Sequence, residues 1–313
     1  MNLRQLDYFV HVAELGSFSK AARVLDIAQP ALSRQVRLLE TDLRETLLLR
    51  NGRGVTMTEA GQRLYDHAVG ILQAVAQAKQ DLGASRDEAV GRITVGLPPT
   101  IGRQLTLPLI DGFRQRMPRA RLAVVEGLSS HIVEWITSGR VDAGLLYNPE
   151  ALAGLEITPV LQEPLCLVQR RAPTECHTSE CRTSVSLADL ARLPLVMPER
   201  SHVFRRLLET QAAMAGQRLE IAWEVSSVGS IIDLVCAGYG HAVLTASAVA
   251  ASGKSDQLRA TPLADPPLMS VLCLGLSASK RPSPLVRQTC VLLTELAAAL
   301  RHGGPHPGVA SAV

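Results

Sequence analysis

The chain has 313 residues, a formal net charge of +3, and a composition that is 47% hydrophobic, 19% charged and 3% aromatic. Its length allows roughly two or three domains of about 100–150 residues each, and its apolar fraction excludes wholesale disorder. The scarcity of aromatic residues argues against a protein that binds single strands by stacking bases on aromatic platforms. Any DNA contact must rest mainly on arginine, because lysine occurs only at positions 20, 79, 254 and 280.

Targeting signals and cofactor motifs are not visible in the sequence. No apolar stretch approaches the ~20 residues that cross a bilayer, and the N-terminus lacks the apolar core of a signal peptide. Six irregularly spaced cysteines do not form a disulfide framework. Cys176 and Cys181 flank His177 without a second ligand pair nearby, which favours incidental thiols over a zinc site. We therefore expect a cytoplasmic protein with no membrane attachment, no metal and no cofactor.

Residues 1–58 predict a winged helix-turn-helix domain. Apolar residues at helical spacing indicate a first helix that ends at Gly16, a short second helix capped by Ser17 or Ser19, and a third helix that begins at Gln29-Pro30. Two short apolar segments then flank Asn51-Gly52-Arg53-Gly54, which is typical of a hairpin, or wing.

The third helix carries the sharpest functional signal. A helix in a major groove presents its N-terminal residues to base edges, so Gln29 could read adenine, Arg34 guanine and Ser33 a base or a phosphate. Arg53 at the wing tip could reach a minor groove or a phosphate. The candidate DNA-binding residues are Ser19, Gln29, Pro30, Ser33, Arg34, Arg37 and Arg53. An ordinary solvated helix face is the alternative, but the tight turn and the basic wing favour DNA binding.

Positive charge is concentrated in this domain, although only modestly. Residues 20–53 contain seven basic and four acidic side chains, a local charge of +3. Specific affinity would then require a dimer on two half-sites about 10 base pairs, or a multiple of that, apart.

Residues 59–90 predict a long linker helix that begins after Thr58. Its apolar residues step by 4, 3, 4, 3 and 4, which is a heptad seam typical of pairing with a second copy. Packing of the stripe on its own chain is the alternative. The candidate dimerisation residues are Leu64, Ala68, Ile71, Val75, Ala78 and Leu82.

From Gly91 onward, short apolar strands alternate with amphipathic helices in two successive sets. This pattern predicts parallel sheets covered on both faces by helices. We expect one regulatory subdomain over residues 91–164 and 266–301, a second over 165–265, and a disordered tail over 302–313. Gly238-Tyr239-Gly240 lacks the third glycine of a nucleotide loop and is interpreted as a helix-ending turn.

The segments Ser17-Phe18-Ser19-Lys20-Ala21-Ala22 and Gln29–Val36, with residues 49–61, resemble the helix-turn-helix signature of LysR-type transcriptional regulators. The N-terminal region is most similar to the nitrogen-assimilation-control (Nac-like) branch. The resemblance extends to about Leu300. It implies two Rossmann-like subdomains of the periplasmic-binding-protein type, with a small effector in the cleft between them. It also implies double-stranded promoter DNA as a partner, homodimers paired through linker helices, dimer-of-dimers tetramers and contact with RNA polymerase.

The resemblance further implies where the effector binds: Thr100, Ile101, Ser129, Ser130, Tyr147, His202, Phe204, Val228 and Gly229. Loops of this kind end a strand and open a helix, so their free N–H groups favour a carboxylate or a similar anion. Ser129 and Ser130 could instead cap a helix. Tyr147 stands where related regulators can carry a cation, and His202 could either supply charge or cap a helix.

Three functions compete. The first is a DNA-binding regulator whose effector changes the angle between subdomains or between dimers. The second is a regulator that needs no effector and is controlled by its own abundance. The third is a solute-binding or enzymatic α/β protein, which is disfavoured because the sequence has no Gly-x-Ser-x-Gly elbow, paired-carboxylate cluster or phosphate loop. We therefore expect a regulator and not an enzyme.

Overall fold

A computed structural model describes residues 1–51, 54–83, 89–171, 184–279 and 281–300. Its N-terminal domain contains α1 (Leu3–Leu15), α2 (Phe18–Val24), α3 (Gln29–Leu43) and a hairpin of β1 (Leu48–Asn51) and β2 (Gly54–Met57). Gly16 ends α1 in a left-handed conformation with φ +59°, and Ser17 caps α2 by accepting from the Lys20 amide. The predicted winged helix-turn-helix is confirmed.

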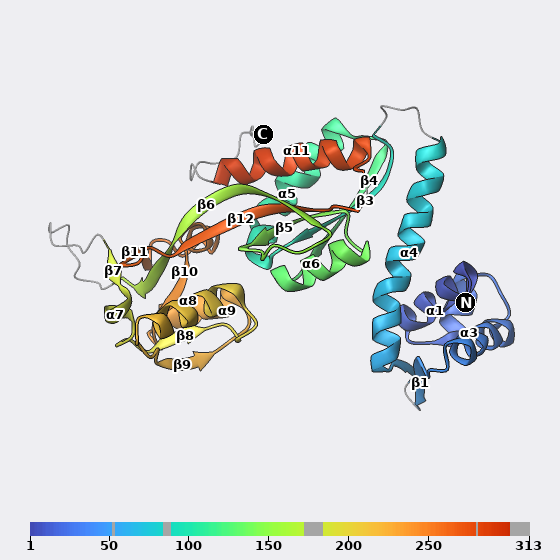
Figure 1. Cartoon of the computed structure of the whole chain (residues 1–313), viewed down its shortest axis with the longest axis horizontal. Coiled ribbons are helices and arrows are strands. Elements are labelled where there is room, and N and C mark those ends of the chain that lie inside the picture. The colour runs from blue at the N-terminus through green and yellow to red at the C-terminus, as the bar shows by residue number, and fades with distance from the viewer. Residues whose placement is uncertain (52–53, 84–88, 172–183, 280, 301–313) are drawn as a thin grey trace, which may run out of the picture.

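The linker helix α4 (Glu59–Gly83) connects this domain to the rest of the chain (Figure 1). Its first turn is capped by Thr58, whose hydroxyl accepts from the Gly61 amide at 2.9 Å. The lower half of α4 packs on α1, and Ala68 is fully buried there.

Two α/β subdomains follow, joined by one continuous strand. Subdomain 1 begins with β3 (Gly91–Leu97), α5 (Pro99–Arg116), β4 (Ala120–Glu126), α6 (Ser129–Ser138) and β5 (Ala143–Tyr147). Strand β6 (Leu155–Arg170) then crosses into subdomain 2, which contains β7 (Val185–Ser186), α7 (Leu187–Leu190), β8 (Leu195–Met197), α8 (Val203–Met214), β9 (Ile221–Glu224), α9 (Val228–Ala237), β10 (Ala242–Thr245), α10 (Ala246–Ala251) and β11 (Leu258–Ala264). The chain returns to subdomain 1 through β12 (Met269–Ser277) and α11 (Pro284–Ala299).

The predicted parallel sheet is confirmed for the three strands that precede the crossover, but the main sheet as a whole is mixed. Strands β4, β3 and β5 are parallel, but β12 runs antiparallel to both β5 and β6, and β10 and β11 run antiparallel to β6. The reason is that the chain crosses between the subdomains twice, in opposite directions. Periodicity along the sequence reports burial but not strand direction.

The strand at the crossover is longer than the apolar pattern of the sequence indicates. Strand β6 spans sixteen residues, but only residues 165–168 form an uninterrupted apolar run. Pro159 and Pro164 interrupt the apolar pattern of β6. Both prolines nevertheless lie opposite β12 residues in the ladder.

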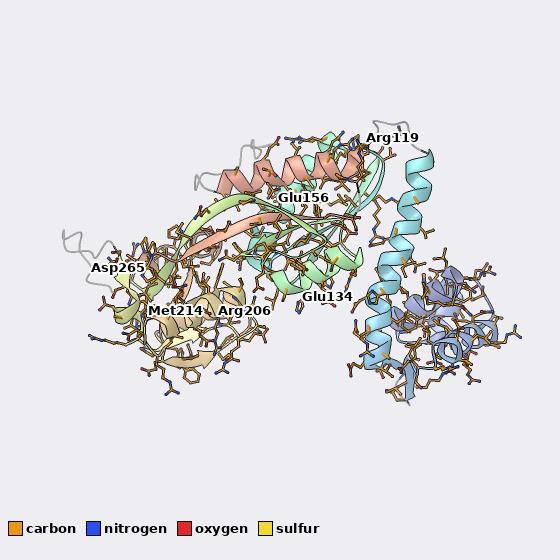
Figure 2. All side chains as sticks on the ribbon, in the orientation of Figure 1. Arg119, Glu134, Glu156, Arg206, Met214 and Asp265 are labelled. Carbon is orange, nitrogen blue, oxygen red and sulfur yellow. The ribbon has the colours of Figure 1, made fainter. Side chains whose placement is uncertain are left out.

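Helices cover the sheet of subdomain 1 on both sides: α5 and α11 on one, α6 on the other (Figure 1). In subdomain 2, Ile231 and Val235 of α9 are completely buried against β8 and β10. The side chains form two bodies on either side of the crossover, with Glu134 on one and Arg206 and Met214 on the other (Figure 2). The cleft between them is where loops from both subdomains meet.

Candidate functional site

The first candidate surface lies on α3. Gln29, Pro30, Arg34 and Arg37 are exposed there, and Ser19 is exposed at the start of α2. Leu32, Val36 and Leu39 face the core of the domain and are completely or almost completely buried. Arg53 lies outside the described residues.

Ser33 does not share this exposure. It is 9% exposed, and its hydroxyl accepts a 2.7 Å hydrogen bond from Arg50 Nη2. The Arg50 guanidinium also lies 4.1 Å from the ring centroid of Phe18. Arg50 therefore connects the wing to α2 and α3, a positioning role that sequence reasoning missed. The sequence places Arg50 next to the predicted wing turn, but its contact with Ser33 is visible only in the fold.

The expected seam on α4 divides into two parts. Leu64 and Ala68 pack into the core of their own N-terminal domain. Farther along, Ile71 is 38% exposed, Val75 is partly buried and Ala78 is exposed. The side chain of Leu82 lies outside the described residues. The upper part of the stripe is thus the part that remains open to a second copy.

A cavity of about 600 Å³ lies between the two subdomains. The expected effector residues other than Ile101 line it: Thr100, Ser129, Ser130, Tyr147, His202, Phe204, Val228 and Gly229. Ile101 instead is completely buried in the core of subdomain 1. Thr100 and Ile101 are neighbours on the first turn of α5, about 100° apart around the helix, so only Thr100 faces the cleft.

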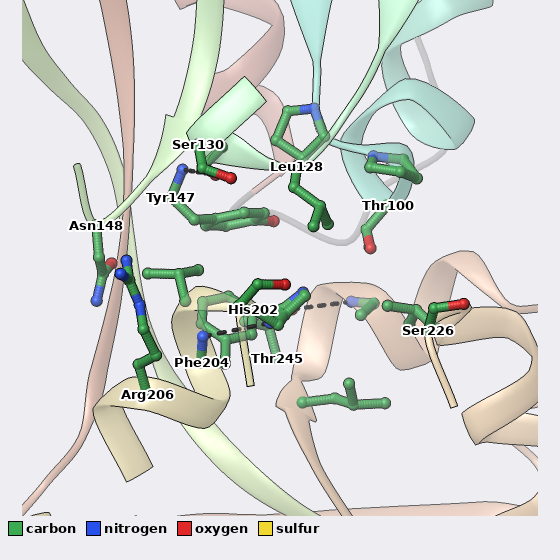
Figure 3. Close-up of a pocket in the computed structure, with 18 of the residues that line it drawn as sticks. Thr100, Leu128, Ser130, Tyr147, Asn148, His202, Phe204, Arg206, Ser226 and Thr245 are labelled. Atoms are coloured by element: carbon green, nitrogen blue, oxygen red, sulfur yellow. Dashed lines mark hydrogen bonds between the residues drawn. The ribbon is translucent and has the colours of Figure 1, made fainter. Parts of the chain in front are cut away.

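Tyr147 is the most unusual group in this cavity. It is 5% exposed, and its hydroxyl is buried without a hydrogen-bond partner among the described residues. Its ring packs edge-on against Phe204 with a centroid separation of 5.0 Å, while Thr100 and Ser130 lie nearby (Figure 3). Burial, followed by the Glu163 carboxylate, raises the pKa of Tyr147 far above its usual 10. The phenol is therefore a neutral donor at physiological pH.

The two serines of α6 do not cap their helix. Leu128 occupies the N-cap position and makes no side-chain cap bond. The Ser129 hydroxyl accepts from the Tyr147 amide at 2.9 Å, which ties α6 to the end of β5. Both serines line the cavity, and Ser130 is exposed.

His202 acts as the N-cap of α8. Its Nδ1 accepts from the Phe204 amide at 3.3 Å. Burial lowers the pKa of His202 to about 4, against a smaller opposing effect of Glu199. The imidazole is neutral at pH 7, so the expectation that it could supply positive charge is wrong and the capping alternative is confirmed.

Charge in the cleft comes from residues that the sequence did not single out. Arg103 and Arg206 line the cavity, and Arg206 Nη2 lies 3.9 Å from Glu150 Oε1. Thr245 also lines it and caps α10 by accepting from the Ala248 amide. Thr245, like the residues that the resemblance implied, lies where a strand ends and a helix begins. Arg103 and Arg206 lie farther along α5 and α8 and were not among those residues.

Comparison with known proteins identifies the family of this chain. Residues 3–62 match the bacterial regulatory helix-turn-helix proteins of the lysR family. Residues 86–298 match the LysR substrate binding domain. The chain belongs to the LysR family of transcriptional regulators. Members of this family bind promoter DNA and small-molecule effectors, act as oligomers and are not enzymes.

Individual relatives of this LysR-type regulator match it over most of its length. It is 32% identical over 297 residues to the nitrogen assimilation regulatory protein nac of Klebsiella aerogenes, which covers 95% of each chain. It is 32% identical over 257 residues to the transcriptional dual regulator OxyR of Escherichia coli, covering 82% of this chain and 83% of OxyR. The structure of full-length CbnR complexed with its target DNA matches 95% of this chain and 100% of CbnR, with a TM-score of 0.54 and 26% identity.

Three of the four described cysteines are buried, and Cys236 is partly buried. Cys166, Cys273 and Cys290 are buried. Burial raises the pKa of all three, to about 11 for Cys166 and about 12 for Cys290. Such thiols stay protonated at neutral pH and are poor nucleophiles. Cys176 and Cys181 lie outside the described residues.

Gly238 ends α9 in a left-handed conformation with φ +87°, which confirms the helix-ending turn. In the part of the chain that is described, no group of three or more His, Cys, Asp or Glu side chains could hold a metal ion. The helices described there are also not long and apolar enough to cross a membrane.

Proposed function

We propose that this regulator acts in the cytoplasm as a homodimer that binds double-stranded promoter DNA through α3 and the wing, with a small molecule in the cleft modulating that binding. Exposed Gln29, Arg34 and Arg37 would meet the major groove, where arginine reads guanine and glutamine reads adenine. Arg50 would hold the wing against α3. Pairing would use the exposed upper stripe of α4, and two dimers would form the tetramer that contacts RNA polymerase.

The observation that carries the effector role is the unpartnered hydroxyl of Tyr147. A buried hydroxyl without a hydrogen bond costs free energy that a ligand acceptor atom would recover. Because the phenol keeps its proton, it can donate a hydrogen bond to an acceptor atom of the ligand. Phe204 and the neighbouring Leu128 and Val133 provide apolar walls for the body of the ligand.

The same cavity favours a small carboxylic acid. Arg103 and Arg206 line it, and the helices α5, α6 and α9 begin at its edge. Free N–H groups at helix starts and arginine guanidinium groups both stabilise a carboxylate. Neutral His202 adds no charge, so a ligand with a single carboxylate and an apolar body fits better than a highly charged one.

The experiment is a thermal-shift screen of the full chain with amino acids, aliphatic carboxylates and aromatic acids. A saturable rise in melting temperature that is lost in Phe204→Ala and retained in the matched surface variant Tyr239→Phe supports the proposal. No shift with any of these acids would contradict the proposed carboxylate class.

The effector-independent regulator is the second candidate, favoured by the similarity to nac along almost the whole chain. In that case the amount of protein alone would set promoter occupancy. Promoter binding titrated with and without the hits of the screen separates the two functions. Identical titrations would support control by abundance.

A further inference from the structure

The linker helix α4 lies directly against the last turn of α6 (Figure 1). Gly70 faces this turn, and a Cβ at position 70 would overlap the carbonyl oxygen of Ser138. Only glycine permits such a close approach of two helix backbones. In an exposed linker helix, glycine costs about 1 kcal/mol of helix stability relative to alanine, so its presence at the point of closest approach indicates a specific contact.

Polar groups hold this contact on both sides of Gly70. With its amide nitrogen turned toward α6, Gln73 donates to the carbonyl oxygens of Gly139 at 2.7 Å and Arg140 at 3.0 Å. Arg140 Nη1 lies 3.5 Å from Asp66 Oδ1, and the Arg140 guanidinium lies 4.8 Å from the ring centroid of Trp135. Asp66, Gly70 and Gln73 are spaced by four and three residues, which places them on one face of α4.

The contact joins the DNA-binding domain to the wall of the cleft. On the α4 side, the Tyr65 hydroxyl donates to Glu14 of α1 at 2.9 Å. On the α6 side, Ile132 packs directly over Gly144 of β5, where a Cβ would lie 2.6 Å from Ile132 Cγ2. α6 is therefore seated firmly on the sheet and moves with subdomain 1. Its first turn carries Ser130 into the effector cavity.

The contact is nevertheless small and polar. Arg140 and Asp66 keep 28% and 19% of their side-chain surface exposed. A cavity of about 320 Å³, lined by Ala74 and Ala78 of α4 and by Val286 of α11, separates the next turns of α4 from subdomain 1. Interfaces of this kind within one chain allow domains to separate. The face that contacts α6 also lies on roughly the opposite side of α4 from Ile71 and Val75, so pairing of two linker helices through these two residues does not compete with docking of α6.

We propose that the α4–α6 contact is a detachable latch that sets the orientation of the winged helix relative to subdomain 1, with Gly70 as the residue that permits the closed state. The regulatory part of this inference rests on the proposed effector function. A ligand that bridges Ser130 and subdomain 2 draws subdomain 1 toward subdomain 2 and, with it, the end of α6 away from α4. Such a ligand shifts the population from the closed to the open latch.

The latch is tested in the full chain with Trp223→Phe as the background, which leaves Trp135 as the single tryptophan. Acrylamide quenching of Trp135 reports the latch, because Arg140 covers this ring in the closed state. Gly70→Ala and Asp66→Ala are expected to shift the closed-to-open ratio at least about tenfold, to raise quenching and to increase the radius of gyration in solution scattering. Arg63→Ala, which removes an exposed ion pair elsewhere on α4, is the matched control.

The outcomes separate the latch from the effector proposal. Asp66→Ala removes the partner of Arg140 on α4 and leaves Arg140 and Trp135 in place, so it guards against a steric artefact of the alanine at position 70. Unchanged circular dichroism shows that both variants fold. Unchanged quenching and scattering in both variants would overturn the latch whatever the result with DNA. If both variants open but promoter titrations with hits of the acid screen match those of the parent chain, the latch stands and its control by a ligand is refuted.

Discussion

Removing the hydroxyl of Tyr147 is expected to stabilise the free regulator while weakening its response to an effector. The side chain is 5% exposed, and its oxygen has no partner among the described residues. A buried hydroxyl without a hydrogen bond costs about 1–3 kcal/mol. Tyr147→Phe removes this cost and leaves the ring contact with Phe204 in place.

The magnitude follows from these terms. We expect the free energy of unfolding to rise by about 1 kcal/mol, which corresponds to an increase of about 2–4 °C in melting temperature for a domain of this size. With ligand bound, the phenol would donate one neutral hydrogen bond worth about 0.5–1.5 kcal/mol. Its loss would therefore weaken the affinity by a factor of about 2–10.

Urea denaturation of the free protein and isothermal titration with a hit of the acid screen measure the two effects. Tyr239→Phe is the matched control, because Tyr239 is 57% exposed and lines no part of the cleft. A loss of stability in free Tyr147→Phe would show that the hydroxyl is already satisfied without a ligand. Unchanged affinity would show that no ligand atom faces it. Either result refutes the reasoning.

Three further predictions concern DNA binding, pairing and pH. Arg34→Ala should weaken promoter binding by about 10–100-fold in fluorescence anisotropy, whereas Arg63→Ala should not, and equal affinities would exclude Arg34 from base reading. Replacing Ile71 and Val75 together with aspartate should dissociate the dimer in sedimentation velocity, and a persistent dimer would place the interface elsewhere. Folding lowers the pKa of His202 to about 4, so the unfolded chain takes up a proton first as the pH falls. Its contribution to stability is complete above about pH 6.5 and is lost toward pH 4, by up to about 3 kcal/mol. His202→Asn should flatten that dependence in urea melts, and an unchanged slope would mean that another group titrates.

The local elements of this protein follow from the sequence alone. Gly16 ends α1, Ser17 caps α2 and Pro30 opens α3, because each of these residues acts through its own backbone and its nearest neighbours. The cleft and its residues were implied by the resemblance to LysR-type regulators. Their arrangement has a physical reason, because a strand that ends in a helix start brings its loop to one edge of a sheet, and Thr100 and Ser130 lie in such loops around one cavity.

Tertiary structure decided what those elements touch. Arg50 reaches Ser33 across the wing and removes it from the exposed face of α3, a contact between segments that no periodicity connects. The sequence predicted that residues 266–301 return to subdomain 1, but the antiparallel direction of β12 against β5 and β6 is visible only in the fold. The Tyr147 hydroxyl has no hydrogen-bond partner among the described residues, and Gly70 lies against the carbonyl oxygen of Ser138. Both features depend on segments that are distant in the sequence. Spacing along a chain determines which face of a helix or strand is apolar, but the partner of that face is selected by packing of the whole molecule.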